Sequence, residues 1–268
     1  MNSLEKQMSQ ILVELRNEFG ALATKAEFEA EGTRIDELLR LIDITRSADL
    51  KITVKIGGCE AIRDLLEAKQ IGVDFIVAPM VESAYAASKF VQAKNLVYDK
   101  DEQSEVDFLC NLETDLGVAN AEQILTSISE ENGLDGLVFG RVDYVGSLKL
   151  ARSEVDSREV LEHVLPVAEM IKNKNLNLVV GGGVSSNSID FLREVSKVHL
   201  TRFETRKIVF QGDSINNVDI ANGLLKAVHF ELLWLLNKRA YYGRIQKEDE
   251  KRIQMLESRW NILKEGAQ

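Results

Sequence analysis

Apolar positions recur in two alternating patterns along most of the chain. Short apolar runs typical of buried strands end at glycine, proline or charged residues, and each is followed by apolar residues at helical spacing. The strands predicted in this way cover residues 22–28, 52–56, 75–78, 108–112, 136–139, 176–180 and 198–201. The predicted helices cover residues 4–19, 35–48, 60–70, 83–92, 119–130, 157–174 and 186–195. An eighth strand would be residues 96–98 or a segment near the N-terminus.

This alternation predicts an α/β fold with a parallel sheet that is buried on both faces. Seven or eight strand–helix units without a dinucleotide-binding glycine pattern favour a closed (β/α)8 TIM barrel over an open sheet. We assign residues 1–215 to this barrel domain. Reactive groups are then expected just after the strands, at the carboxyl end of the barrel.

Residues 216–268 exceed what one barrel needs and predict an extra C-terminal helical arm. Two helices are expected, joined near Tyr241 and Gly243, and the second carries Ile253, Leu256, Trp260 and Leu263 at helical spacing. Such helices either cover the barrel or pack on a neighbouring subunit. We favour the second arrangement, which makes the protein a homo-oligomer.

Composition narrows the class of protein. Of the 268 residues 45% are apolar, which is enough for a large core, and the net charge is −10. This charge argues against nucleic acid or an anionic membrane as the main partner. No stretch is long and uncharged enough to span a membrane, the two cysteines make no disulfide framework, and the first residues lack signal-peptide form. We therefore expect a soluble cytoplasmic protein that acts on small molecules.

Two carboxylates follow predicted buried strands. Glu113 comes after the run 108–112, and Asp143 comes shortly after the run 136–139, about one strand–helix unit later. Parallel strands that end in carboxylates can place both groups on one divalent cation, and Mg²⁺ or Mn²⁺ leaves coordination positions open for substrate. The alternative is that both are ordinary acidic residues of strand-end loops.

The first predicted strand is unusually charged. Lys25, Glu27, Glu29 and Glu31 alternate with apolar residues and share one face. Because neither face of a barrel strand accepts four charges, we expect Glu29 or Glu31 to lie past the strand end and to act in the active site. Lys55 interrupts the second strand and could orient an anionic substrate, stabilise an oxyanion or form a Schiff base.

Two further segments are candidate anion sites. Gly182 and Gly183 lie in a glycine-rich loop between a strand and a helix, where backbone amides can approach an anion. Arg202 and Arg206 follow the last predicted strand and could clamp a second anion. A capped tight turn and surface salt bridges are the alternative interpretations of these segments.

Three segments resemble the HpcH/HpaI family of metal-dependent pyruvate aldolases and citrate lyase β-subunits. Residues 77–84 (VAPMVESA), residues 112–114 (LET) and residues 133–143 (GLDGLVFGRVD) match that family's strand-end segments in the correct order. The resemblance covers residues 50–150 well and the rest only in outline. It implies a carbon–carbon lyase or aldolase on a TIM barrel.

The resemblance also implies roles for individual residues. Glu113 and Asp143 would be the protein ligands of Mg²⁺ or Mn²⁺, and a 2-keto acid such as pyruvate would chelate that metal. Backbone amides of the segment Gly140, Arg141, Val142 and Asp143 would hold the substrate carboxylate. The metal would act as a Lewis acid that stabilises an enolate.

Three departures from the family pattern indicate a specialised branch. Lys55 stands where the family has arginine, Arg141 stands where it has proline, and residues 28–32 lack its histidine. The general base would then be Glu29, Glu31 or a metal-bound water. The glycine loop and Arg202 suggest that the aldehyde or acyl partner of the keto acid is anionic.

Two other functions remain open at this point. A Schiff-base aldolase could use Lys55 or Lys25, with the two carboxylates as proton shuttles. A non-catalytic barrel could bind a metabolite or a partner protein.

Overall fold

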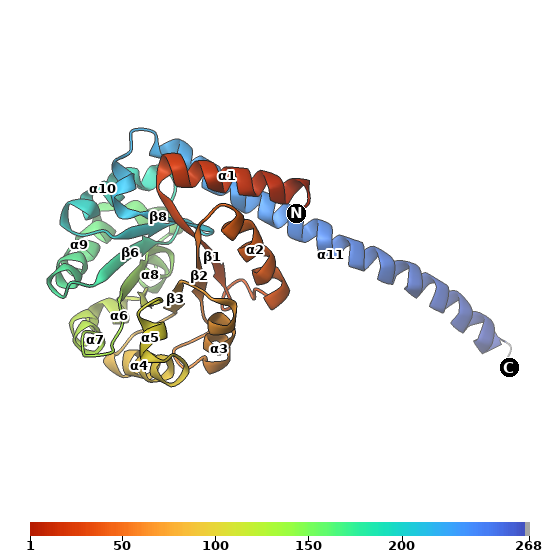
Figure 1. The fold of residues 1–268 in the computed structure, drawn as a ribbon, viewed down its shortest axis with the longest axis horizontal. Coiled ribbons are helices and arrows are strands. Elements are labelled where there is room, and N and C mark those ends of the chain that lie inside the picture. The colour runs from red at the N-terminus through yellow and green to blue at the C-terminus, as the bar shows by residue number, and fades with distance from the viewer. Residues whose placement is uncertain (266–268) are drawn as a thin grey trace.

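Eight short strands close into a barrel in the order of the chain, as Figure 1 shows. The computed structural model describes residues 1–265. The strands are β1 (Ala21–Glu27), β2 (Lys51–Lys55), β3 (Phe75–Ala78), β4 (Asp107–Leu112), β5 (Gly136–Gly140), β6 (Asn177–Gly181), β7 (Arg202–Glu204) and β8 (Ile208–Gln211). The predicted TIM-type barrel is thereby confirmed.

The closing strand differs from the regular pattern. Strands β1 to β7 pair in parallel, but β8 pairs antiparallel with both β7 and β1. Only residues 205–207 separate β7 from β8, and so short a link makes a hairpin and not a crossover. The last unit of the barrel is therefore a β-hairpin.

Two strand predictions were wrong. Residues 96–98 lie at the end of a helix, and the predicted strand 198–201 begins with the last residue of another helix. The strands that exist are β7, which begins at Arg202, and β8, whose run Ile208-Val209-Phe210 is β-branched and aromatic.

Helices surround the barrel, and those that begin at Ser3, Ala84, Asp115 and Arg158 are capped by the side chains of Asn2, Ser83, Thr114 and Ser157. They are α1 (Ser3–Phe19), α2 (Ile35–Ser47), α3 (Ile62–Ile71), α4 (Ala84–Val97), α5 (Lys100–Gln103), α6 (Asp115–Ala119), α7 (Ala121–Ile128), α8 (Arg141–Ser147), α9 (Arg158–Asn173), α10 (Ile189–Val198) and α11 (Ile220–Glu265), with 3-10 turns η1 (Arg152–Asp156), η2 (Ser186–Ser188) and η3 (Gly212–Asn216). Their apolar faces and the outer faces of the strands form the main core. Inside the barrel, Val77, Leu109, Val138 and Val179 of four successive strands form a separate cluster.

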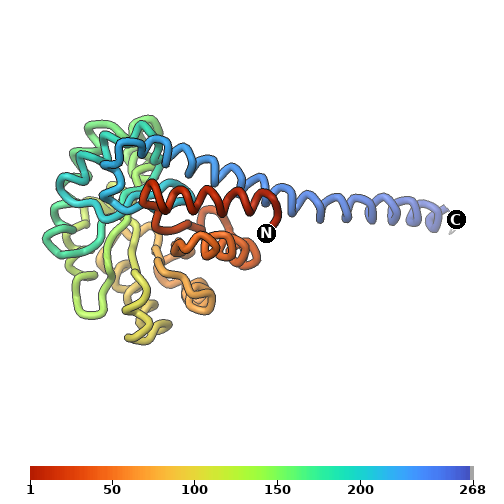
Figure 2. Tube along the Cα trace, turned by 45° about the horizontal axis from the view of Figure 1, so that its top comes forward, coloured from red at the N-terminus to blue at the C-terminus, as the bar shows by residue number. Residues whose placement is uncertain are grey.

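The C-terminal segment is one helix where two were expected. The first half of α11 lies beside α1, and Gly223, Leu224, Phe230 and Trp234 are buried there. The second half projects away from the barrel, as Figures 1 and 2 show, and every residue from 244 to 265 is exposed. Gly243 does not break the helix, because a glycine inside a helix costs only about 1 kcal/mol.

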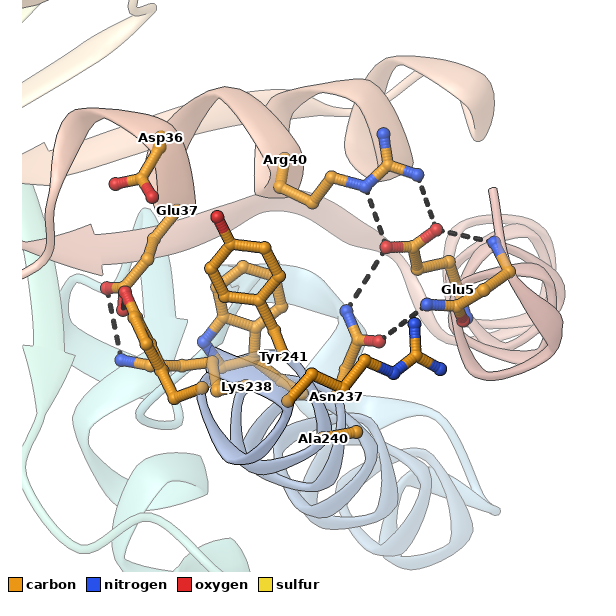
Figure 3. Close-up of a pocket in the computed structure, with 12 residues that line it drawn as sticks. Glu5, Asp36, Glu37, Arg40, Asn237, Lys238, Ala240 and Tyr241 are labelled. Atoms are coloured by element: carbon orange, nitrogen blue, oxygen red, sulfur yellow. Dashed lines mark hydrogen bonds and ion pairs between the residues drawn. The ribbon is translucent and has the colours of Figure 1, made fainter. Parts of the chain in front are cut away.

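A polar cluster fixes the point at which α11 leaves the barrel (Figure 3). Glu5 of α1 accepts hydrogen bonds from Arg40 of α2 (Nε–Oε1, 2.7 Å) and from Asn237 of α11 (3.2 Å). Glu37 of α2 accepts a hydrogen bond from Lys238 of α11 (3.1 Å). Three helices are thereby joined through buried carboxylates.

No helix among residues 1–265 combines the length and apolar character needed to cross a membrane.

Candidate active site

A cavity of about 450 Å³ opens at the carboxyl end of the barrel. It is lined by residues at or just after the ends of six strands and by two residues of α11. Eight of the residues that the sequence singled out lie on its wall: Glu29, Lys55, Glu113, Gly140, Val142, Asp143, Gly182 and Gly183. This is the end of the barrel at which TIM-barrel enzymes carry their active sites.

Glu113 is the most buried acidic group of the cavity, with an exposed fraction of 2%. Its Oε1 accepts the amide N–H of Met80 at 3.0 Å, and its Oε2 accepts Nδ2–H of Asn111 at 2.5 Å. Met80 has a φ of +52°, which is uncommon for a residue with a side chain. A Cβ at Gly140 would lie 2.7 Å from Oε2, so only glycine fits beside this carboxylate.

Asp143 reaches the same cavity from the neighbouring strand. It lies in the first turn of α8, directly after β5, and its side chain is exposed. The amides of a first turn have no partner within their helix. A Cβ at Gly182 would lie 2.6 Å from the amide nitrogens of both Arg141 and Val142, so the glycine loop runs against this turn.

Lys55 lies between two carboxylates. Its Nζ is 3.4 Å from both oxygens of Glu113 and 3.1 Å from Oε2 of Glu29. Within residues 1–265, Oδ1 of Asn111 is buried and accepts no hydrogen bond, whereas the buried Oε2 of Glu29 has the ammonium of Lys55 as its ion-pair partner. Buried oxygens without a donor are uncommon in native structures, so Oδ1 of Asn111 indicates a ligand that donates or a cation.

The donor atoms fit a hard divalent cation. The part of the chain that the structure describes contains no convergent group of three His, Cys, Asp or Glu side chains. Mg²⁺, however, is commonly held by one or two carboxylates, with water and substrate oxygens in the other positions. Glu113, Asp143 and Oδ1 of Asn111 supply oxygen ligands of this type.

A buried ion triad forms another part of the wall; the sequence indicated Lys25 and Glu27 as unusual charges but did not pair them with Glu204. Nζ of Lys25 lies 2.5 Å from Oε1 of Glu204 and 3.2 Å from Oε1 of Glu27. Burial lowers the pKa of Lys25, but the carboxylates of Glu204 and Glu27 outweigh it and hold the pKa above its ordinary value. Lys25 is therefore charged and poorly suited to form a Schiff base.

Arg206, which the sequence offered together with Arg202 as an anion clamp, lies on the wall. Three other wall residues, Asn111, Arg152 and Glu231, were missed because they come from separate elements. Burial raises the pKa of the Glu231 carboxyl, which makes this group of α11 a possible proton donor. The alternation of Lys25, Glu27 and Glu29 was the only sequence signal for this part of the cavity.

Three predicted site residues lie elsewhere. Arg202 is at the amino end of the barrel, where it pairs with Asp107 (2.9 Å) and covers the ring of Phe75. The side chain of Arg141 is fully buried and points away from the cavity. Glu31 pairs with Lys207 and Arg206 and is not on the cavity wall.

Comparison with known proteins identifies the family to which the barrel belongs. The profile of the HpcH/HpaI aldolase/citrate lyase family matches residues 11–205, well over half of the chain. The chain belongs to the HpcH/HpaI aldolase/citrate lyase family. No curated protein matches it significantly. The family name supports lyase-type chemistry at the carboxyl end of this barrel.

Solved structures of this HpcH/HpaI family share the fold at low identity. An HpcH/HpaI aldolase/citrate lyase family protein from Burkholderia cenocepacia J2315 has a TM-score of 0.61 and 15% identity over 92% of this chain and 99% of its own. An HpcH/HpaI aldolase from Desulfitobacterium hafniense DCB-2 has a TM-score of 0.59 and 14% identity over 74% and 82%. The citrate synthase SbnG has a TM-score of 0.57 and 17% identity over 74% and 81%.

Proposed function

We propose that this protein is a metal-dependent carbon–carbon lyase or aldolase that acts on a 2-keto acid such as pyruvate. The observation that carries the proposal is that Glu113 and Asp143 follow neighbouring strands and reach one cavity. Glu113, Asp143 and Asn111 would hold Mg²⁺ or Mn²⁺. When bound, such a cation supplies Lewis acidity to a keto oxygen.

Residues of the chain would bind the substrate, stabilise the oxyanion and move the proton. The first-turn amides near Val142 would hold the carboxylate of the keto acid, and the ammonium of Lys55 would donate a hydrogen bond to the developing oxyanion. Oε2 of Glu29 would remove a proton from the carbon next to the ketone, because Glu29 lies on the cavity wall and this oxygen is paired with the ammonium of Lys55. The electron pair of that C–H bond would then form the bond to the carbonyl carbon of the partner.

The partner of the keto acid is expected to be an aldehyde or an acyl compound. Arg152 and Arg206 lie on the cavity wall together with the glycine loop, and both arginines are exposed. Cations beside backbone amides favour an anionic partner. Arg202 no longer supports this inference, since it lies at the other end of the barrel.

Exchange of pyruvate methyl protons in deuterated water, followed by NMR, tests the proposal. We expect exchange with Mg²⁺ or Mn²⁺ that EDTA abolishes. Exchange that persists in EDTA, together with borohydride trapping of pyruvate on Lys55, would favour a Schiff-base aldolase. Absence of exchange under both conditions would contradict the proposal and favour a barrel that binds without catalysing.

The projecting half of α11 supports the homo-oligomer expected from the sequence. Ile253, Leu256, Trp260 and Leu263 recur at three- and four-residue intervals in the part of α11 whose residues are all exposed. This spacing is that of a coiled-coil seam, and the interspersed Lys, Arg, Asp and Glu residues allow the helix to pair with itself. We propose a second copy of the chain as the partner. Light scattering would show a dimer or larger assembly, and a monomer in the wild type would contradict this.

A further inference from the structure

Arg141 immediately precedes the proposed substrate-binding amides, yet its side chain turns away from the cavity. Its exposed fraction is 0%, and its guanidinium lies 4.7 Å from the centre of the Phe191 ring. A buried guanidinium is costly unless its donors are matched, so the acceptors around it indicate what it holds.

Each of the five N–H donors of Arg141 has an acceptor. Nε donates to the carbonyl of Gly181 (3.1 Å), and Nη2 donates to the carbonyl of Gly182 (3.0 Å) and to the hydroxyl of Ser188 (3.4 Å). Nη1 donates to the carbonyl of Val155 (3.3 Å) and forms an ion pair with Asp156. Only arginine presents five donors in a planar fork.

These acceptors belong to separate segments of the cavity wall. Gly181 and Gly182 belong to the glycine loop, and Asp156 ends η1, whose first residue Arg152 also lines the cavity. Ser188 closes the network, because its hydroxyl accepts the amide of Ser185 (3.2 Å) and donates to Asp156 (3.1 Å). One guanidinium thus joins the glycine loop, η1 and the start of α8.

We infer that Arg141 is a positioning residue that sets the distance between the glycine loop and the turn carrying Val142 and Asp143. The loop needs such fixing, because Gly182 and Gly183 adopt φ values of +82° and +72° and glycine has many other backbone conformations available to it. The role in substrate binding rests on the proposed function. The role in holding the loop does not.

The variants R141K and D156N test this inference, with R202K as the matched control. Arg202 is also a buried arginine that pairs with one aspartate and covers a phenylalanine ring, but it lies at the amino end of the barrel. Lysine at 141 keeps the charge and loses the fork. We expect R141K to raise KM for pyruvate in the proton-exchange assay ~10- to 100-fold, because misplacement by about 1 Å has effects of this size. We expect kcat to change less than KM.

Hydrogen–deuterium exchange of the amides of residues 181–188 gives a readout that needs no substrate. We expect faster exchange there in R141K than in the wild type and no change in R202K. Should R141K not fold, D156N keeps the guanidinium and removes its ion pair, and we expect a smaller change in the same direction. Absence of pyruvate proton exchange in the wild type would overturn the proposed function but not the inference about Arg141. Unchanged loop exchange in a folded R141K or D156N would overturn the inference.

Discussion

The two ends of the barrel both contain buried charges, but the charges are used differently. At the amino end, Arg202 has a full set of neighbours: the carboxylate of Asp107 at 2.9 Å and the ring of Phe75 at 4.4 Å. At the carboxyl end, the ammonium of Lys55 is shared between Glu29 and Glu113, and the buried Oδ1 of Asn111 lacks a donor. Charges with a full set of partners stabilise the fold, whereas an oxygen without a donor beside a cavity of about 450 Å³ indicates a binding site for a ligand.

The largest effect on activity is expected from removal of the two candidate metal ligands. Glu113→Gln and Asp143→Asn should each lower pyruvate proton exchange by roughly 10²- to 10³-fold or more, because one preorganised charge at a reacting centre has effects of this size. Thermal stability of Asp143→Asn should be nearly unchanged, since the side chain is exposed. Calorimetric titration with Mn²⁺ provides the binding measurement, and wild-type affinity in both variants would rule out the proposed site.

Substitution of Lys55 tests the role of the lysine ammonium at the carboxyl end of the barrel. Lys55→Met should reduce exchange by ~10²-fold, because the developing oxyanion loses a donor while Glu29 and Glu113 remain close to it. Lys55→Arg is the matched control, since it retains the charge, and it should keep more activity than Lys55→Met. Equal activity of the wild type and Lys55→Met would show that the lysine has a structural role alone.

The same two ends show what could be predicted from the sequence. Glu113 was placed correctly because the apolar run before it is long and unambiguous, and β4 ends at Leu112. Arg202 was placed at the wrong end because the predicted strand ended at residue 201, whereas β7 begins at Arg202. The first and last residues of a strand lie at opposite ends of the barrel. A strand predicted a few residues too early therefore assigns to the active site a residue that lies at the other end and has a structural role.

Other parts of the cavity depend on closure of the barrel. Glu204 and Lys25 are 179 residues apart, and their contact exists only because β7, β8 and β1 are neighbours in the ring. The direction of the Arg141 side chain depends on acceptors in two later loops. No local pattern of residues carries this information, whereas the strand–helix alternation that predicts the barrel is repeated along the chain.

Removal of Arg202 should have a smaller effect than the site substitutions, and it should lower stability while leaving activity unchanged. Arg202→Met loses the ion pair with Asp107 and the contact of its charge with Phe75, and should lower the free energy of unfolding by about 1–3 kcal/mol. Pyruvate exchange per folded molecule should not change. Urea denaturation gives the stability, and a rise in KM for pyruvate in this variant would show that the two ends are not separate in function.

The smallest expected effect lies outside both ends, where Glu5 joins three helices (Figure 3). Its hydrogen bonds from Arg40 lower the pKa of Glu5 from 4.5 to about 2. A carboxylate with a lowered pKa stabilises the folded state above the unfolded pKa, and this stabilisation is lost as the pH falls from about 4.5 towards about 2. Urea denaturation should therefore show that Glu5→Gln is less stable than the wild type at pH 6 by about 1 kcal/mol, because Arg40 is partly exposed and solvent screens the pair. The difference should shrink at pH 3, because the Glu5 carboxyl of the unfolded wild type is then mostly protonated and folding has to release that proton. A difference that is constant between pH 6 and pH 3 would mean that the charge of Glu5 does not hold α1, α2 and α11 together.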